Sequence, residues 1–172
     1  MEKKELENLW LKGKIILPMI NLKQQQIKEI ADALDCGMYC YYNTKTHEVR
    51  EMINFDQNEF ADEEEGEELL NEIEENYQDY FNFEKMSPHE AFDLMKDFIE
   101  QVENAELRKR LIWILNKSHP FRNFKDEIDY SGEYREKWFT FKLQKGMESV
   151  ERQIQVHNEL EEFNQKQTTS DK

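Results

Sequence analysis

The sequence predicts an α+β fold that is mostly helical, with a small antiparallel sheet and a C-terminal half made entirely of helices. The 172 residues include 11 Phe, 7 Tyr and 3 Trp, which is enough large apolar material for a hydrophobic core. Only 5 Gly and 3 Pro occur beside 35% charged residues, a composition that favours helices with solvated faces. One short stretch, 38–53, has the composition of a β-hairpin. We therefore expect five or more helices packed with two or three strands.

The chain length predicts a single domain over 1–165. Residues 1–21 are interpreted as an N-terminal arm, with a short strand or a partner contact as the alternatives, because Pro18 interrupts an apolar run and prevents one continuous helix. An acidic segment spans 54–78, and the polar residues 166–172 form a flexible tail. The first helix is expected over 22–34, where apolar residues recur at offsets of three and four, with Gly37 as its terminator.

The sheet is expected to begin with the hairpin 38–53. Residues 38–42 are β-prone and rich in Tyr, and residues 48–53 alternate in part between apolar and polar. A polar connection at 43–47 has hairpin length. Because a lone hairpin is only marginally stable, a third strand is expected at 79–83. Between hairpin and third strand we expect a helix over 62–76, with Leu69, Leu70 and Ile73 as its buried stripe.

The C-terminal half contains clear helix starts. Ser87 with Glu90 forms a capping box and is followed by Pro88, which predicts a helix with a broad apolar face. Asn104 is the expected cap of a second helix, and Ile112 and Trp113 are expected to widen its apolar stripe, which suggests that this helix is central. A short helix is expected around 120–128, and a long last helix after a cap at 131.

The net charge of −15 is concentrated in one part of the chain. Residues 51–84 contain 14 acidic residues and no Lys or Arg, whereas the rest of the chain is nearly neutral. The segment is interpreted either as a solvated surface or as a docking surface for a basic partner. A calcium loop starting at Asp56 is excluded, because its fifth position, which must supply an oxygen ligand, holds Phe60, and its sixth, which needs Gly, holds Ala61. The predicted acidic docking surface consists of Asp62, Glu63, Glu64, Glu65, Glu67 and Glu68.

No catalytic, cofactor or metal motif is present in the sequence. The five glycines are scattered, no Ser lies in a nucleophile elbow, and the four histidines are far apart. Cys36 and Cys40 have neither zinc nor redox spacing and are expected to be free thiols. We therefore expect no cofactor and no metal, and no enzyme activity is assigned. The chain shows no signal peptide and no apolar run of membrane-spanning length, which indicates a cytoplasmic protein without a membrane partner.

A basic and aromatic stretch, 108–145, is the candidate for nucleic-acid binding. It contains ten basic and five acidic residues with interleaved aromatic residues, a composition typical of a charged groove with stacking platforms. The competing interpretation is that the aromatic residues form a core and that the bases pair with nearby acids, as Arg122 can with Asp126.

Several signatures occur in the order that is typical of one family. They are Ala33-Leu34, Tyr41-Tyr42, the acidic stretch, the helix at 94–99, the sequence from Pro120 to Asp126 and the helix at 134–141. Over residues 22–155 the chain resembles the bacterial uncharacterised protein family 0158. The resemblance implies a shared fold and no assigned chemistry. It also implies a Gly in the hairpin turn, where this chain has His47.

The leading functional hypothesis is a non-catalytic binding or regulatory protein that acts through a protein partner. Nucleic-acid binding by the 108–145 stretch is the second hypothesis, and an enzyme with a site built from dispersed carboxylates and Arg is the third. The predicted binding residues are the polar and aromatic group Arg122, Lys125, Asp126, Arg135 and Trp138. This group is interpreted either as a structural corner with Phe121 and Phe124 buried, or as a small anion-binding surface.

Overall fold

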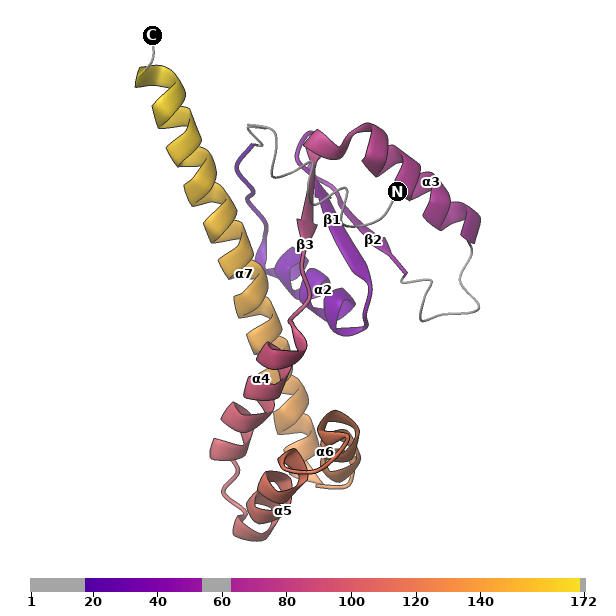
Figure 1. Cartoon of the computed structure of the whole chain (residues 1–172), viewed down its shortest axis with the longest axis vertical. Helices are drawn as coiled ribbons and strands as arrows, with labels where there is room; N and C mark the ends of the chain where they lie inside the picture. The colour runs from indigo at the N-terminus through magenta and orange to yellow at the C-terminus, as the bar shows by residue number, and fades with distance from the viewer. Residues whose placement is uncertain (1–17, 54–62, 171–172) are drawn as a thin grey trace. The chain divides into compact units, whose positions relative to one another are not determined.

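The computed structural model describes residues 18–53 and 63–170. The chain divides into two compact units, which we describe separately. The sheet unit comprises Met1–Lys85 with Val150–Lys172, and the helical unit comprises Met86–Ser149. Over the described ranges the structure confirms the predicted fold class, with mostly helical elements and a three-stranded antiparallel sheet (Figure 1). The single domain expected over 1–165 stays a prediction.

The sheet unit begins with residues 18–23, which lead without regular structure into helix α2, Gln24–Asp35. Residues 1–17 of the predicted arm lie outside the described residues. Gly37 ends α2 as the sequence predicts. Its φ is +83°, its N–H donates to the Leu34 carbonyl, and the next N–H, of Met38, donates to Ala33. This is the Schellman arrangement that favours glycine at its left-handed position.

The sheet has the order β2-β1-β3. Strand β1, Tyr39–Asn43, pairs antiparallel with β2, Val49–Met52, and with β3, Tyr80–Phe83. The hairpin 38–53 and the third strand at 79–83 are therefore confirmed. At the turn, His47 has a φ of +63°, the conformation that the glycine implied by the family would adopt readily. Its Nδ1 lies 2.8 Å from the hydroxyl of Tyr42, a hydrogen bond that glycine could not make.

Alternation along the strands gives the sheet two apolar faces. One face packs against α3, Glu63–Glu75, where the core cluster comprises Met52, Leu69, Ile73 and Tyr80, with Tyr39, Tyr41 and Leu70 packed around it. The other face carries Cys40, whose Sγ lies 4.0 Å from the Ile30 carbonyl of α2. Helices α2 and α3 thus lie on opposite sides of the sheet (Figure 1). A 3-10 turn, η2, Tyr77–Asp79, joins α3 to β3.

The last helix, α7, spans Glu133–Ser170, and its part from residue 150 onward belongs to the sheet unit. Two amide side chains of α7 pair with extended backbone. Gln153 accepts from the N–H of Glu84 and donates to its carbonyl, at 2.8 and 2.9 Å. Asn158 does the same with Ile20, at 2.7 and 2.9 Å. These pairs give hydrogen-bond partners to backbone groups that lie outside the ladder.

The helical unit contains α4, Pro88–Glu100, α5, Ala105–Leu115, α6, Pro120–Asp129, and the first part of α7. The predicted capping box of α4 is present, with the Ser87 hydroxyl accepting from the Glu90 N–H and the Glu90 carboxylate accepting from the Ser87 N–H. The Asn104 side chain accepts from two N–H groups in the first turn of α5. These contacts explain why the boundaries of both helices are readable in the sequence.

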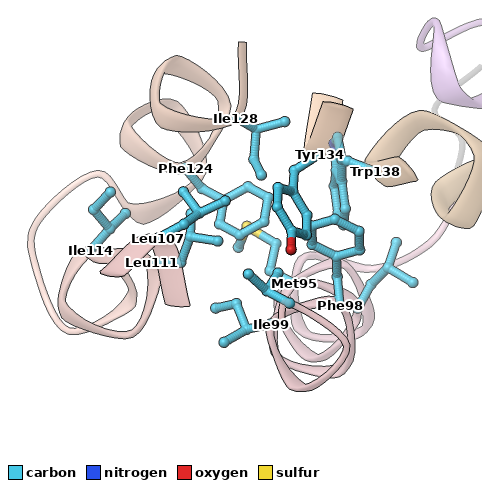
Figure 2. Close-up of a cluster of buried hydrophobic side chains, with 12 residues drawn as sticks. Met95, Phe98, Ile99, Leu107, Leu111, Ile114, Phe124, Ile128, Tyr134 and Trp138 are labelled. Carbon is cyan, nitrogen blue, oxygen red and sulfur yellow. The ribbon is translucent and has the colours of Figure 1, made fainter. Parts of the chain in front are cut away.

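All four helices contribute to one core (Figure 2). Leu111 and Val102 are at most 1% exposed, and Phe124 of α6 is 1% exposed. Trp138 of α7 packs edge-on against Phe98 and Phe124, with ring centroids 5.1 and 4.9 Å apart. Such edge-to-face pairs add to the stabilisation from burial. The cluster of aromatic side chains thus holds α4, α6 and α7 together.

Several expectations about single residues are wrong. Ile112 and Trp113 do not widen the buried stripe of α5, because their exposed fractions are 47% and 62%. Phe121 is 45% exposed rather than buried, although its ring contacts Phe92. Ser131 does not cap α7; its hydroxyl donates to the Ile128 carbonyl, and the helix begins after Gly132.

Two other expectations concern the flexible tail over 166–172 and the lack of a membrane-spanning segment. Helix α7 continues to Ser170, into the segment 166–172 for which the sequence predicts a tail. Within the described ranges, no helix combines the length and the apolar composition needed to cross a membrane.

Candidate binding pocket on the helical unit

The predicted binding residues do not form one surface. Trp138 is 8% exposed and lies inside the core cluster, so its ring is a packing element. Arg135 is exposed, pairs with Asp129 at 3.2 Å and lies over the ring of Phe139 at 4.8 Å. Contacts within the helical unit therefore explain the positions of both Trp138 and Arg135.

Arg122, Lys125 and Asp126 are all exposed on α6. The expected ion pair between Arg122 and Asp126 is absent from those that join described residues. Of the two aromatic residues of the predicted corner, Phe124 is buried and Phe121 is not. The corner is thus fixed by Phe124 rather than by pairing among its own charges.

The predicted acidic docking surface is described only in part. Asp62 lies outside the described residues, as do the side chains of Glu63, Glu64, Glu65 and Glu67, whose backbone is helical in α3. Glu68 is exposed. The docking role of this surface stays a prediction.

The basic and aromatic stretch 108–145 contains many paired charges. At least five of its ten bases form ion pairs with carboxylates: Lys109 with Glu106, Arg110 with Glu127, Arg135 with Asp129, Lys137 with Glu133, and Lys145 with Glu148. The hydrogen bond to the Glu133 carboxylate raises the pKa of Lys137. Ion pairs with nearby acidic residues are therefore common in the stretch 108–145. Such pairing is the interpretation that competes with a nucleic-acid groove.

A pocket of about 420 Å³ lies between α5 and α6, and the residue that follows α6 also lines it. Helix α6 contributes Asn123, Asp126 and Glu127, and Tyr130 follows at its end, spacings that place these residues on one face of the helix. Helix α5 contributes Trp113 and the buried Ile114, which belongs to the core cluster. The pocket therefore contacts the core of the helical unit through Ile114, and its other lining side chains lie at the surface of that unit.

Its two aromatic residues are unusually accessible. Tyr130 is 92% exposed and Trp113 is 62% exposed. The ammonium group of Lys117 lies 4.6 Å from the centre of a Trp113 ring, so one part of the indole already contacts a cation. The Asn123 amide is oriented by donating to the Ser118 carbonyl at 2.9 Å.

The two carboxylates of the pocket differ in their surroundings. Glu127 accepts from Arg110 at 2.7 Å, which balances its charge. Asp126 is exposed and makes no ion pair with any described residue. One carboxylate without a countercharge therefore lies beside two exposed aromatic rings.

Sequence reasoning included Asp126 but missed Trp113, Tyr130, Asn123 and Glu127. A signal for Trp113 was present in the sequence. At 3.6 residues per turn, Leu107, Leu111 and Ile114 fall on one side of α5, and Trp113 falls well away from that side. A large aromatic residue off the apolar stripe of a short helix indicates an exposed side chain. No comparable signal identifies Tyr130.

The pocket offers two aromatic rings, two carboxylates and one amide for contacts with a ligand. Its lining contains Trp, Ile, Asn, Asp, Glu and Tyr, without Ser, Cys, His or Lys. In the described part of the chain, no group of three or more His, Cys, Asp or Glu is arranged to hold a metal ion.

Fold and pocket together define an α+β protein with a three-stranded sheet unit and a helical unit that carries a surface pocket. The family model of the Uncharacterised protein family UPF0158 matches residues 16–167. The chain therefore belongs to this family, as the sequence resemblance indicated. No curated protein and no solved structure matches the chain.

Proposed function

We propose that this protein is a non-catalytic binding protein that acts through a protein partner, and that the pocket between α5 and α6 contacts that partner. The observation that supports this most strongly is the exposure of Trp113 and Tyr130 in the same pocket. Tyr and Trp are enriched at protein interfaces and are common among the residues that dominate binding energy. Their accessibility in one place favours a surface that a partner covers.

The charge distribution supports a basic partner. The acidic stretch 51–84 gives the chain its net charge of −15. A negative field raises the rate at which positively charged surfaces approach. The predicted acidic docking surface, of which Glu68 is described and exposed, would act in this way.

The paired bases favour a protein partner over nucleic acid. At least half of the bases in 108–145 already contact carboxylates, and two of its aromatic residues, Phe124 and Trp138, are in the core. Asp126, the carboxylate of the pocket that makes no ion pair with a described residue, would repel phosphates. The lining holds no Ser, Cys, His or Lys, and Glu127 is held in an ion pair with Arg110, which favours binding over catalysis.

The test compares capture of proteins from a native lysate by the full-length chain and by two variants. The pocket variant carries Trp113→Ala and Tyr130→Ala. The control carries Phe163→Ala, which removes an aromatic side chain that is 58% exposed on α7 in the sheet unit. We expect the wild type and the control to enrich the same protein and the pocket variant to lose it. Equal enrichment by all three chains, or enrichment that disappears after nuclease treatment, would contradict the proposal.

A further inference from the structure

We propose that the pocket between α5 and α6 takes an arginine side chain of the partner, with the guanidinium stacked against Trp113 or Tyr130 and its charge facing Asp126. This inference rests on the proposed function and names the chemistry of the contact. It follows from the accessibility of the aromatic faces and from the unbalanced charge of one carboxylate.

The aromatic rings are suited to a cation. An indole face attracts positive charge through its quadrupole, and it does so more strongly than a phenol or phenyl face. The contact with Lys117 shows that a Trp113 ring accepts a cation within this structure. With 62% of Trp113 and 92% of Tyr130 exposed, a second cation can reach either ring.

The charge of the pocket selects a cation over an anion. The ion pair with Arg110 balances Glu127 and leaves Asp126 as the carboxylate without a countercharge among described residues. A guanidinium presents paired N–H donors that match a carboxylate. The Asn123 amide, which also lines the pocket, adds a polar group at the same surface.

Arginine fits this combination better than lysine. Its guanidinium is planar, it stacks on aromatic rings while donating hydrogen bonds at its edge, and it is less strongly hydrated than an ammonium group. A pocket that offers aromatic faces beside a carboxylate uses both properties at once. Arginine is also enriched in the protein interfaces where Trp and Tyr occur.

The experiment is an NMR titration of the full-length protein that follows the indole N–H signal of Trp113. The probes are the blocked pentapeptide Gly-Gly-Arg-Gly-Gly and the same peptide with citrulline, which keeps the shape of arginine and lacks its charge. We expect a saturable shift with the arginine peptide and binding weaker by about threefold to tenfold with citrulline, the range that cation–π contacts and exposed ion pairs support. The lysine peptide should bind between these two.

Variants test the role of the carboxylate. Asp126→Asn should weaken binding of the arginine peptide by about threefold or more, and so should an increase in salt. The control Asp97→Asn removes an exposed carboxylate of α4 that does not line the pocket, and binding should stay unchanged. Unchanged folding of each variant is checked from the signal of the buried Trp138.

Three results would overturn the inference. These are no shift at millimolar arginine peptide, equal binding of the citrulline peptide, and full binding by the Asp126→Asn variant. A stronger shift with single-stranded oligothymidine than with the arginine peptide would assign the pocket to nucleic acid instead. If the peptides fail and pocket-dependent capture from lysate persists, the proposed function stands and the arginine contact is rejected.

Discussion

Truncation of the two tryptophans of the helical unit should lower its stability to very different extents. Trp138→Ala removes a ring that is 8% exposed and packs against Phe98 and Phe124 at 5.1 and 4.9 Å. Replacing a buried Trp by Ala costs about 3–5 kcal/mol, because burial is lost and a cavity remains. The loss of two edge-to-face contacts, worth about 0.5–1.5 kcal/mol each, places this site towards the upper end of that range.

Trp113→Ala removes a ring that is 62% exposed and contacts the Lys117 ammonium. The cation–π contact is worth about 0.5–1 kcal/mol at an exposed site. We therefore expect the free energy of unfolding to fall by less than about 1 kcal/mol, compared with at least about 3 kcal/mol for Trp138→Ala.

Urea unfolding, combined with hydrogen exchange of the α4 and α5 amides, measures how far each variant lowers the stability of the helical unit. Protection should fall steeply in Trp138→Ala and stay near the wild-type level in Trp113→Ala. Trp138→Phe is the matched control and should retain most of the stability, since an aromatic ring still fills the core. Equal destabilisation by the two alanine variants, or a loss below about 1 kcal/mol at Trp138, would refute the assignment of Trp138 to the core and Trp113 to the surface.

Four further residues give separate tests. Asn104→Ala removes the cap of α5 and should lower the free energy of unfolding by about 1 kcal/mol in urea titrations, whereas Asn104→Asp, which keeps the acceptor, should not. Cys36 is exposed and Cys40 is buried. Mass spectrometry after treatment with a thiol reagent should therefore show one modified cysteine in the native protein and two after denaturation. Two modified cysteines in the native protein would contradict the burial of Cys40. Burial, and to a lesser degree the nearby charge of Glu51, raises the pKa of Cys40 from 9.0 to about 12. The folded state therefore holds this proton when the unfolded state has lost it, so stability should fall as pH rises from 9 towards 12, and the fall should be smaller in Cys40→Ala. His47→Gly relieves the strain of the positive φ but loses the hydrogen bond to Tyr42, so its free energy of unfolding should stay within about 1 kcal/mol of the wild-type value. His47→Val loses the same hydrogen bond and also strains the turn, so its free energy of unfolding should fall by about 2 kcal/mol.

The parts of the fold that follow from local rules were predictable. A capping box needs only Ser87, Pro88 and Glu90 in fixed order, and the Schellman ending of α2 needs only Gly37 after an amphipathic stretch. The third strand was predictable because an isolated hairpin requires more buried surface, and residues 80–83 supply the β-prone side chains. In the first two cases neighbouring residues determine the outcome, and in the third the β-prone composition of a distant segment does.

The pocket was less predictable because it depends on which faces of two helices meet. The spacing of apolar residues in α5 separates Trp113 from its buried stripe, but the position of Tyr130 beside it depends on how α6 packs. Arg122 and Asp126 have the spacing of an ion pair and do not form one, since an exposed pair gains little energy. Asp126 belongs to a local cluster of charged and aromatic residues in the sequence, whereas Trp113 lies outside that cluster, although both line the same pocket.

Helix α7 completes the cores of both units, with Trp138 in one and Val150 and His157 buried in the other. It follows every other described element in the chain. During synthesis, α4, α5 and α6 therefore emerge without the ring that packs against Phe98 and Phe124, and the strands emerge without the amides that pair with Glu84 and Ile20. Neither unit can reach its final packing before α7 is made, so the nascent chain exposes apolar surface until α7 has been synthesised.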